Sequence, residues 1–479
     1  MDATTAETTA EGAAGTESAE RARAAALAAV ERRLAEVETL GGQLSDAIGS
    51  IVDSVVALKT DEVGTLQRRL RELEQQLALE RCLRDLDHTS RAHPKTRCVV
   101  FVGTIYFGDN VKYAWLGFRA RARRDGIACW FLPQNAAQQA IVEGLGEACL
   151  PHRWSDWTAE HLHAALSAAA VVTSDHLLNP NPYAGALLAG ARHVQLWHGV
   201  SIKEIGLRNL PPLAQLSPRM ARVLATCGPF AELVGTSAAA ESEWRRWFGF
   251  ERYAPIGYPR NDVLHREPTA DDLLNTDSTT LARMRQAGSE GRRVWLWAPT
   301  FRDANRGRWL IEAGAGRIAA ELQRRRELLV VNLHPVEQAQ LDELRAALPG
   351  VVFVAAETDL YPLLAASSAL ITDYSSIMFD YLHLQRPIVL FRPDHGDYTT
   401  RSRTLFDAKL AGRLPGPVVG DAGALLGLLA KAHTGTEAHA QARDVLRAEL
   451  YDHHDGRSAE RLADRLVALL PEPARPGAA

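Results

Sequence analysis

The sequence has little of several features that would assign a protein class at once. No apolar run approaches the ~18 residues that a membrane-spanning helix needs. The five cysteines are odd in number and form no CxxC pair, so we expect reduced thiols rather than a disulfide framework or a zinc site. With 54 basic and 58 acidic residues the net charge is only −4, which excludes a nucleic-acid binder held by bulk positive charge.

The beginning of the chain also lacks the features of a secretory signal peptide. Residues 1–20 carry acidic but no basic residues and have no apolar core, so we expect a cytoplasmic protein. Residues 1–18 consist mostly of Ala, Thr, Glu, Gly and Ser. This composition leaves almost nothing to bury and predicts a disordered tail.

Residues 19–88 have the apolar spacing of a coiled coil. Apolar residues recur alternately three and four positions apart over about seven heptads, with Gly41 in place of one of them. The pattern shifts by one residue near Val63, as in a stutter. Its members are Leu27, Val30, Leu34, Val37, Leu44, Ile48, Ile51, Val55 and Leu58, then Leu66, Leu70, Leu73 and Leu77. The pattern predicts a self-associating helix; the alternative is a single long helix packed on the globular part.

From residue 97 onward, short apolar runs alternate with amphipathic stretches. This alternation predicts an α/β fold with parallel, doubly wound sheets. The predicted strands are 98–103, 127–132, 171–174, 194–197 and 233–236, then 294–298, 328–333, 351–354, 370–372 and 388–391. Because the polar segment 266–292 divides them five and five, we expect two Rossmann-like domains, residues 96–270 and 285–470, facing each other across a cleft.

The end of the chain is predicted to contain one more helix. Residues 458–470 form an amphipathic pattern, and Ser458 is a candidate N-cap. The following residues 471–479 are rich in Pro, Ala and Gly and are expected to be flexible.

Ligands of doubly wound folds bind beyond the carboxyl ends of the strands, so the residues after each predicted strand are the candidates for a site. Two histidines stand at such positions. His198 follows the strand 194–197 and is followed by Gly199, which allows backbone to approach a ligand. His334 follows the strand 328–333.

Groups suited to an anion stand at other strand ends. Ser375 and Ser376 follow Asp373 at the start of a predicted helix, where hydroxyls and free N–H groups favour an anion. Arg302 follows the strand 294–298, and Arg260 lies in a turn between the domains. Each feature alone has a structural explanation. Together they suit a nucleotide diphosphate donor, with a histidine to deprotonate an acceptor hydroxyl.

The segment Trp197-His198-Gly199, with Lys203 and Gly206, resembles the WHGTxxKxxG segment of the CDP-glycerol glycerophosphotransferase family, whose members polymerise teichoic acids and related capsular polymers. Further family segments follow in order: GYPRND at 257–262, APTFRD at 298–303, LHP at 333–335, ITDYSS at 371–376 and PGP at 415–417. The resemblance covers roughly residues 97–465. The chain departs from the family pattern at Val200-Ser201, where Thr-Pro is usual, and at Thr404, where glycine is common.

The resemblance implies a GT-B arrangement in which residues 96–270 form the acceptor side and residues 285–470 bind the CDP donor. It implies that His198 is the general base for attack of an acceptor hydroxyl on the β-phosphorus of CDP-glycerol, with CMP leaving. His334 would hold or protonate the phosphate oxygens. Further expected roles are pyrophosphate binding by Ser375 and Ser376, charge compensation by Arg302 and Arg403, orientation of the serines or of His334 by Asp373, and acceptor contacts by Asn110, Lys112 and Lys203. Asp380 is a candidate for a ribose contact, and a role on the helix surface is the alternative.

No His, Asp or Glu cluster has metal-ligand spacing, so we expect neither a metal nor another cofactor. The expected partners are a CDP-polyol donor, an anionic polymer acceptor, including a lipid-linked one, and further copies of the chain. A lipid-linked acceptor would place the protein peripherally at the inner face of the cytoplasmic membrane.

Two other functions remain open at this point. A GT-B glycosyltransferase that uses a UDP- or GDP-sugar would share the fold and the anion site. A non-enzymatic coiled-coil scaffold with a degenerate transferase domain is a further alternative, although the histidines, arginines and serines of the pattern are all present.

Overall fold

The computed structural model describes residues 7–176, 181–201, 204–209, 215, 217, 220, 224, 226–300, 302, 308–333, 337, 340–395, 413–430 and 438–473; within the first helix, the side chains of 20–54, 56 and 64–92 are described. The chain divides into two compact units, Met1–Cys82 and Leu83–Ala479.

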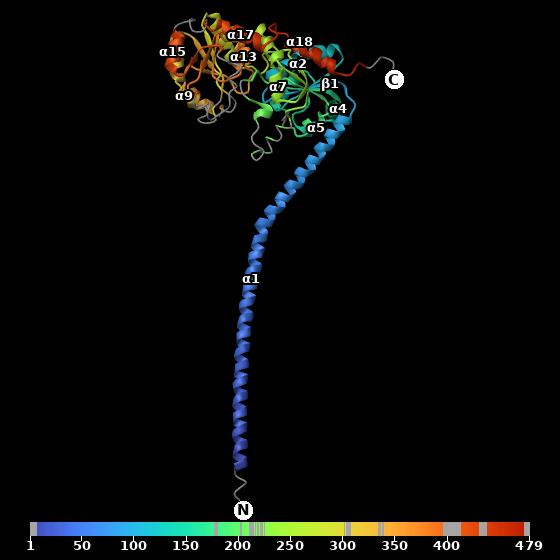
Figure 1. Ribbon diagram of the computed structural model, residues 1–479, viewed down its shortest axis with the longest axis vertical. Helices are drawn as coiled ribbons and strands as arrows, with labels where there is room; N and C mark the ends of the chain where they lie inside the picture. The colour runs from blue at the N-terminus through green and yellow to red at the C-terminus, as the bar shows by residue number, and fades with distance from the viewer. Residues whose placement is uncertain are drawn as a thin grey trace, which may run out of the picture. The chain divides into compact units, whose positions relative to one another are not determined.

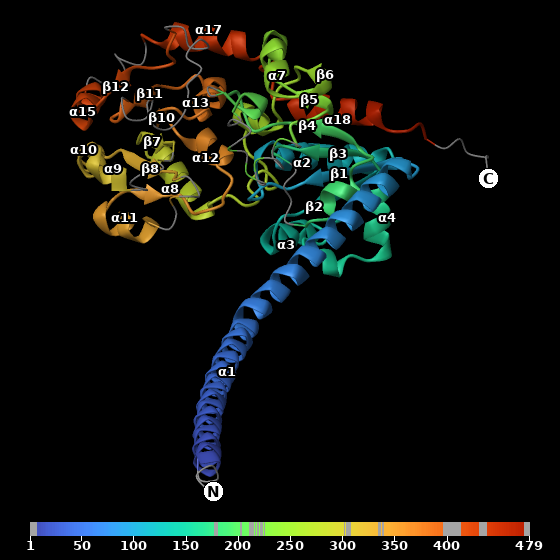
Figure 2. The same cartoon turned by 60° about the horizontal axis from the view of Figure 1, so that its bottom comes forward.

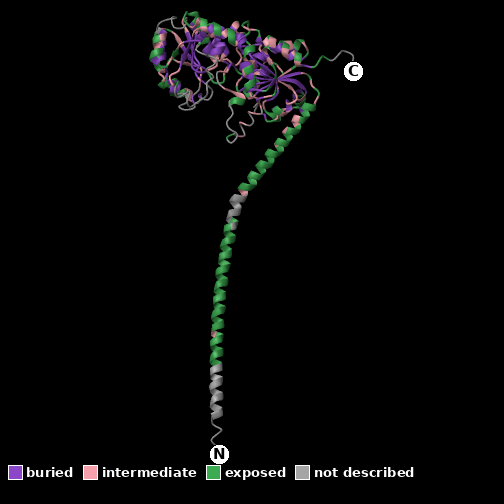
Figure 3. Cartoon of the chain, in the orientation of Figure 1, coloured by how far each residue is buried: buried purple, intermediate pink, exposed green. Residues whose placement is uncertain are grey.

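The first unit is helical. Helix α1, Glu7–Ala92, forms all of its described part and ends in the second unit (Figure 1). The helix begins inside the segment 1–18 for which the composition predicts disorder. Ala and Glu, which are frequent there, are strong helix formers, so helix propensity explains this difference. The described heptad residues of α1 are exposed and lie in the green part of the helix in Figure 3, and their pairing with another helix stays a prediction.

The second unit contains two parallel sheets, which confirms the predicted α/β class. In the described residues each sheet has six strands, in the orders β2-β1-β3-β4-β5-β6 and β12-β11-β10-β7-β8-β9 (Figure 2). The first sheet consists of β1 (Thr96–Val102), β2 (Ala128–Leu132), β3 (Ala168–Thr173), β4 (Arg192–Gln195), β5 (Phe230–Val234) and β6 (Phe250–Ala254). The second consists of β7 (Val294–Trp297), β8 (Leu328–Val331), β9 (Val352–Phe353), β10 (Ala369–Thr372), β11 (Ile388–Phe391) and β12 (Val418–Val419).

Helices and 3-10 turns connect these strands. In the first half they are α2 (Asp109–Arg124), α3 (Ala136–Gly144), η1 (Trp154–Asp156), α4 (Ala159–Ser167), α5 (Ala184–Leu187), η2 (Gly206–Asn209), η4 (Ala238–Ala240), α7 (Glu241–Trp247) and η5 (Pro259–His265). In the second half they are α8 (Ser278–Ser289), α9 (Arg308–Glu312), α10 (Ala315–Arg324), α11 (Leu341–Ala347), α12 (Tyr361–Ala366), α13 (Ile377–Tyr381), η7 (Leu382–Leu384), α15 (Ala422–Ala430), α17 (Ala440–Leu450) and α18 (Ser458–Leu469).

All ten predicted strands are present, but the sheets have one more strand each. β6 and β12 are both edge strands. The sequence of β6, FERYA, exposes its central charged residues, and β12 has only two residues, so neither is a buried apolar run. A search for short apolar runs in the sequence therefore misses both strands.

The predicted linker 266–292 is not an extended connection. It contains helix α8, whose N-cap Asp277 accepts a hydrogen bond from the Thr280 backbone N–H at 2.9 Å. Leu281, Met284 and Ala287 on one face of α8 are buried in the core. Three apolar residues at helical spacing are a weak signal of a helix among so many polar neighbours. This explains why the polar composition of the segment predicts a linker.

One apolar core runs through both halves of the second unit. It contains Val99 of the first sheet and Leu296 of the second, together with Val263 of η5 and Leu363 of α12. The predicted C-terminal helix is present as α18 and packs on α2 of the first half. Its N-cap is Arg457 rather than Ser458.

The end of α1 is built into the second unit. Ser90 is fully buried, and its hydroxyl donates to the Leu187 carbonyl at 2.6 Å and accepts from the Gly190 N–H at 3.0 Å. The Lys95 ammonium donates to the Ser90 and Leu166 carbonyls. These contacts fix the last turn of α1 before β1 begins.

Candidate active site

The second sheet brings Asp373 and Arg302 together at its carboxyl edge. The chain order reverses between β7 and β10, which is where ligands bind in such sheets. Asp373, directly after β10, accepts hydrogen bonds from the Thr300 N–H at 2.9 Å and hydroxyl at 2.8 Å, after β7. The Arg302 guanidinium lies 2.9 Å from the other Asp373 oxygen. Asp373 thus orders the loop that carries Arg302.

A second carboxylate, that of Asp394, also holds Arg302, and the sequence analysis did not predict it. Asp394, after β11, accepts from Nε and Nη2 of Arg302 at 2.5 and 3.0 Å. Burial opposes the charge of Arg302, but hydrogen bonds and attraction to Asp394 and Asp373 outweigh it and raise its pKa above the ordinary value. Arg302 is therefore charged and oriented before any ligand arrives.

The two serines are accessible. Ser375 and Ser376 are partly exposed directly before α13, whereas Asp373 beside them is buried. Because α13 has only five residues, we attribute any anion affinity here to the hydroxyls rather than to a helix dipole.

His198 stands in a backbone turn held in an uncommon conformation. Its neighbours Trp197 and Gly199 have φ of 53° and 132°. The Trp197 N–H donates to the Gln195 side chain at 2.9 Å, and the Trp197 carbonyl accepts from Asn110 Nδ2 at 2.8 Å. A non-glycine residue at positive φ needs such support, and it is found most often at functional sites.

The turn brings Gly199, the neighbour of His198, next to Ser376 of the other half. A Cβ added to Gly199 would lie 3.6 Å from the Ser376 hydroxyl and 2.6 Å from Arg260 Nη2. Glycine is therefore required here both for its φ and for the space. The structure thus brings two predicted site residues, Arg260 and Ser376, against the turn that carries His198.

The His198 ring is half-exposed, with its Nδ1 3.9 Å from a carboxylate oxygen of Asp175. It stacks on Trp197 with ring centroids 4.3 Å apart. Asp175 is a second residue that sequence reasoning missed, although it directly follows the predicted strand 171–174. The criterion that selects His198, a position directly after a predicted strand, also applies to Asp175.

Arg260 is buried between two carboxylates. Its Nη1 donates to Asp109 at 2.6 Å and its Nη2 to Asp380 at 2.7 Å. The Tyr361 hydroxyl donates to the same Asp380 oxygen at 2.8 Å. Burial acts against the Arg260 charge, but Asp380 and Asp109 outweigh it and hold the pKa well above the ordinary value. Arg260 thus joins α2, η5 and α13 beneath the Gly199 backbone.

This arrangement changes the expected roles of Asp380 and Asn110. Asp380 is 1% exposed and is engaged by Arg260, so it has no free face for a ribose hydroxyl. Asn110 is fully buried: it donates to Trp197 and accepts from the Arg260 backbone N–H at 3.2 Å. Asn110 therefore supports the turn before His198 instead of contacting an acceptor.

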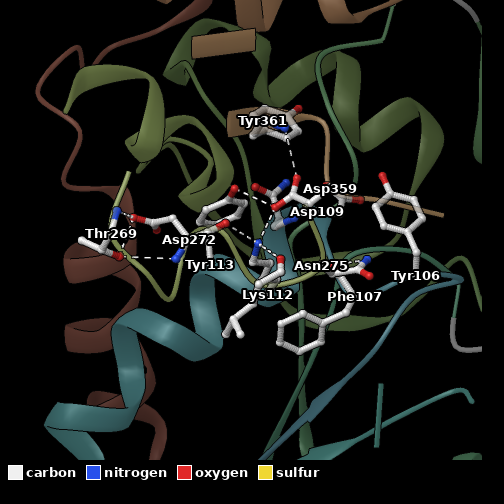
Figure 4. Close-up of polar contacts among 12 residues, drawn as sticks. Tyr106, Phe107, Asp109, Lys112, Tyr113, Thr269, Asp272, Asn275, Asp359 and Tyr361 are labelled. Atoms are coloured by element: carbon white, nitrogen blue, oxygen red, sulfur yellow. Dashed lines mark hydrogen bonds and ion pairs between the residues drawn. The ribbon is translucent and has the colours of Figure 1, made fainter. Parts of the chain in front are cut away.

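Lys112 is also buried and paired, so it is not available to bind an acceptor. Figure 4 shows its ammonium pointing at Asp359, 2.6 Å away, with both side chains fully buried. Its other two hydrogens go to the Asp272 and Leu274 carbonyls at 2.7 Å each. The Tyr113 hydroxyl donates to the same Asp359 oxygen at 2.7 Å. Lys112 has no hydrogen left for an acceptor, and it ties α2 to the second half.

The GYPRND segment acts as a structural junction. Asp262 accepts from the first two N–H groups of α18, those of Ser458 and Ala459, at 2.9 and 2.8 Å. Gly257, with φ of 89°, leaves room for the Ser458 side chain. The segment thus orients the returning C-terminal helix and the Arg260 cluster together.

Three predicted site residues, His334, Lys203 and Arg403, lie outside the described residues. Within the described part, no three His, Cys, Asp or Glu side chains are placed to hold a metal ion. Among the helices of the described residues, none has the length and apolarity that crossing a membrane takes.

The comparison with known families decides the assignment. A model of the CDP-glycerol:poly(glycerophosphate) glycerophosphotransferase family matches residues 152–468. The chain belongs to this family. The match confirms the resemblance on the WHG, GYPRND and TDYSS segments, and it makes the chain a member of a family of transferase enzymes.

Curated relatives and solved structures agree with this family. The chain is 26% identical over 290 residues to a teichoic acid ribitol-phosphate primase of Bacillus spizizenii W23, covering 58% of this chain and 69% of the primase. It is 25% identical over 295 residues to a teichoic acid glycerol-phosphate transferase of Staphylococcus aureus NCTC 8325, covering 57% and 70%. The wall teichoic acid polymerase TagF has a similar fold, with a TM-score of 0.62 at 19% identity over 85% of this chain and 98% of TagF.

Proposed function

We propose that this chain transfers glycerol phosphate from CDP-glycerol to a hydroxyl of a growing cell-surface polymer and releases CMP. Its family and its teichoic acid relatives support this activity. The observation that carries it is the approach of the His198–Gly199 turn to Ser376. The turn that carries the base of one half lies there against a hydroxyl-bearing residue of the other, which suits transfer between an acceptor and an anionic donor.

In this reaction His198 takes the proton of the acceptor hydroxyl as the acceptor oxygen attacks the β-phosphorus. The new bond joins that oxygen to the phosphorus. The bond from the phosphorus to the bridging oxygen breaks, and its electron pair leaves with CMP. Asp175 faces Nδ1, so Nε2 is the nitrogen that receives the proton, and the negative charge stabilises the imidazolium that forms.

The donor is assigned to the carboxyl edge of the second sheet. Ser375 and Ser376 would donate their hydroxyl hydrogens to the pyrophosphate. Arg302, already oriented by Asp373 and Asp394, would add positive charge at the same edge. We keep His334, Arg403 and Lys203 in their expected roles, the first two at the phosphates and the last at the acceptor. Residues 285–470 would form the donor domain and 96–270 the acceptor domain.

The polyol and the acceptor are narrower proposals. Relatives are named for both ribitol phosphate and glycerol phosphate, and the glycerol unit is our first choice because the family is named for it. An acceptor that is lipid-linked, a role in capsule formation and peripheral attachment to the cytoplasmic membrane belong to the same proposal.

Product analysis tests the reaction. The purified full-length protein is incubated with CDP-glycerol and a short glycerol-phosphate oligomer, and the products are identified by mass spectrometry. We expect CMP together with an oligomer that has gained glycerol phosphate. Turnover of CDP-ribitol alone would keep phosphotransfer and replace the polyol. Release of UDP or GDP from a sugar nucleotide, with all CDP-polyols inert, would overturn the proposal in favour of a glycosyltransferase.

A further inference from the structure

Helix α1 carries a long row of apolar side chains that are exposed wherever they are described. In its described part, eleven heptad side chains are each more than half exposed. They are Leu27, Val30, Leu34, Val37, Leu44, Ile48 and Ile51, then Leu66, Leu70, Leu73 and Leu77. Soluble proteins rarely expose a contiguous apolar surface of this size unless it binds a partner.

The charges beside the row identify the partner and its direction. With Leu27 and Leu34 at heptad positions a, Arg33 is at position g and Glu38 at position e of the next heptad. After the shift, Leu70 is at position a, which puts Arg69 at g and Glu74 at e. All four charged side chains are exposed.

In a parallel, in-register pair, position g of one helix faces position e of the following heptad of the other. Arg33 would then face the second copy's Glu38, and Arg69 its Glu74, twice each by symmetry. An antiparallel pair places position g beside g and position e beside e, so neither of these Arg–Glu pairs would form. We propose that two copies of this chain pair through α1 as a parallel, in-register, two-stranded coiled coil.

The same register places two further exposed apolar side chains beside the row. Leu40 at position g and Val52 at position e are exposed and widen the contact surface on either side of the seam. Gly41 occupies an a position, and a Cβ placed there meets nothing within 4 Å in the single helix. A leucine at this position would fill the missing layer between the copies.

The parallel direction has a consequence for the second unit. The last turn of α1 is anchored there through Ser90, so each copy carries its α/β unit at the carboxyl end of the coiled coil. A parallel pair brings both units to the same end, whereas an antiparallel pair places them at opposite ends.

Mass measurement of the full-length protein by light scattering gives the first test. We expect twice the chain mass of 52.4 kDa at micromolar concentration. Gly41→Leu is expected to lower the concentration at which the dimer dissociates. A monomer at tens of micromolar, or a trimer or tetramer, would overturn the proposal.

Charge reversal tests the register. Arg33→Glu with Arg69→Glu replaces four attractive contacts per dimer with repulsive ones, and should weaken the dimer about tenfold or more. Adding Glu38→Arg and Glu74→Arg restores the dimer. The matched control reverses Arg32 and Arg68, which are at outward f positions, and should leave dissociation within about twofold of wild type. Equal effects of both reversals would contradict the register.

Cysteine cross-linking tests the direction. In a Cys82→Ser background, Leu34→Cys places two cysteines at facing a positions of a parallel, in-register pair, and oxidation should give a covalent dimer. Arg32→Cys, two residues away at an outward position, should not cross-link. Failure of the Leu34→Cys variant to cross-link, in a protein that is dimeric by light scattering, would show an antiparallel or shifted pair and overturn the proposal.

Discussion

Replacing Lys112 with methionine should destabilise the second unit by about 3–5 kcal/mol. The Lys112 ammonium and the Asp359 carboxylate lie 2.6 Å apart, and both side chains are fully buried. Methionine keeps the length of the side chain but removes its charge. Asp359 is then left with a buried negative charge, and among the described residues its remaining partners are the Tyr113 hydroxyl and the Tyr361 N–H. An uncompensated buried charge is what makes the loss of one partner so costly.

A double-mutant cycle isolates the interaction. Lys112→Met, Asp359→Asn and the double variant are unfolded in urea and followed by tryptophan fluorescence. We expect a coupling energy of about 2–3 kcal/mol, the upper range for neighbouring groups. The control is the same cycle on Arg91 and Asp87, an i,i+4 pair with side chains 63% and 41% exposed, for which about 0.5 kcal/mol or less is expected.

The result also separates two roles for Lys112. If Lys112 bound the acceptor, its replacement would raise the KM for the polymer and leave stability within about 0.5 kcal/mol of wild type, as surface substitutions do. That outcome, with a coupling energy no larger than the control, would refute the burial argument and return Lys112 to the acceptor side.

Three further outcomes follow from the site. Asp175→Asn removes a negative charge 3.9 Å from His198 that would stabilise the imidazolium formed during transfer, so kcat should fall by about fivefold, the factor for about 1 kcal/mol of lost attraction in water; an unchanged kcat would contradict the pairing. Gly199→Ala introduces a Cβ 2.6 Å from Arg260 Nη2 at a φ of 132°, which should cost about 1–3 kcal/mol in urea unfolding and most of the activity; full activity would contradict the close approach. Burial and cationic neighbours lower the pKa of His383 well below its ordinary value, so the unfolded chain takes up the proton first and stability should fall below about pH 6.5; His383→Asn should flatten this slope, and equal slopes in thermal melts would contradict the assignment.

Much of the fold was predictable because buried parallel strands are short apolar runs. Such a run signals its own burial, and the residue after it is placed at the carboxyl edge without further information. This logic finds Asp373, Arg302 and His198 from the sequence. It fails for β6 and β12, because an edge strand buries only part of its surface and can be polar or very short.

The roles of the charged residues were not predictable in the same way. Lys112 and Asp359 are 247 positions apart, and Arg260 and Asp380 are 120 apart. Nothing local in the sequence tells a buried, paired lysine from a surface one that binds an anion. Whether a charged side chain is buried depends on which residues of the other half of the chain pack against it. The family motifs therefore identified the positions of these charged residues but not their contacts.

The central claim is that His198 removes the acceptor proton in a transfer that releases CMP. The most direct test is the rate of acceptor-dependent CMP release from CDP-glycerol by the full-length protein and by His198→Ala, with His88→Ala, an exposed histidine of α1, as the control. We expect His88→Ala to match wild type and His198→Ala to lose at least about 100-fold, the size of a general-base contribution. CMP release by His198→Ala at the wild-type rate, with the protein folded by circular dichroism, would contradict the account.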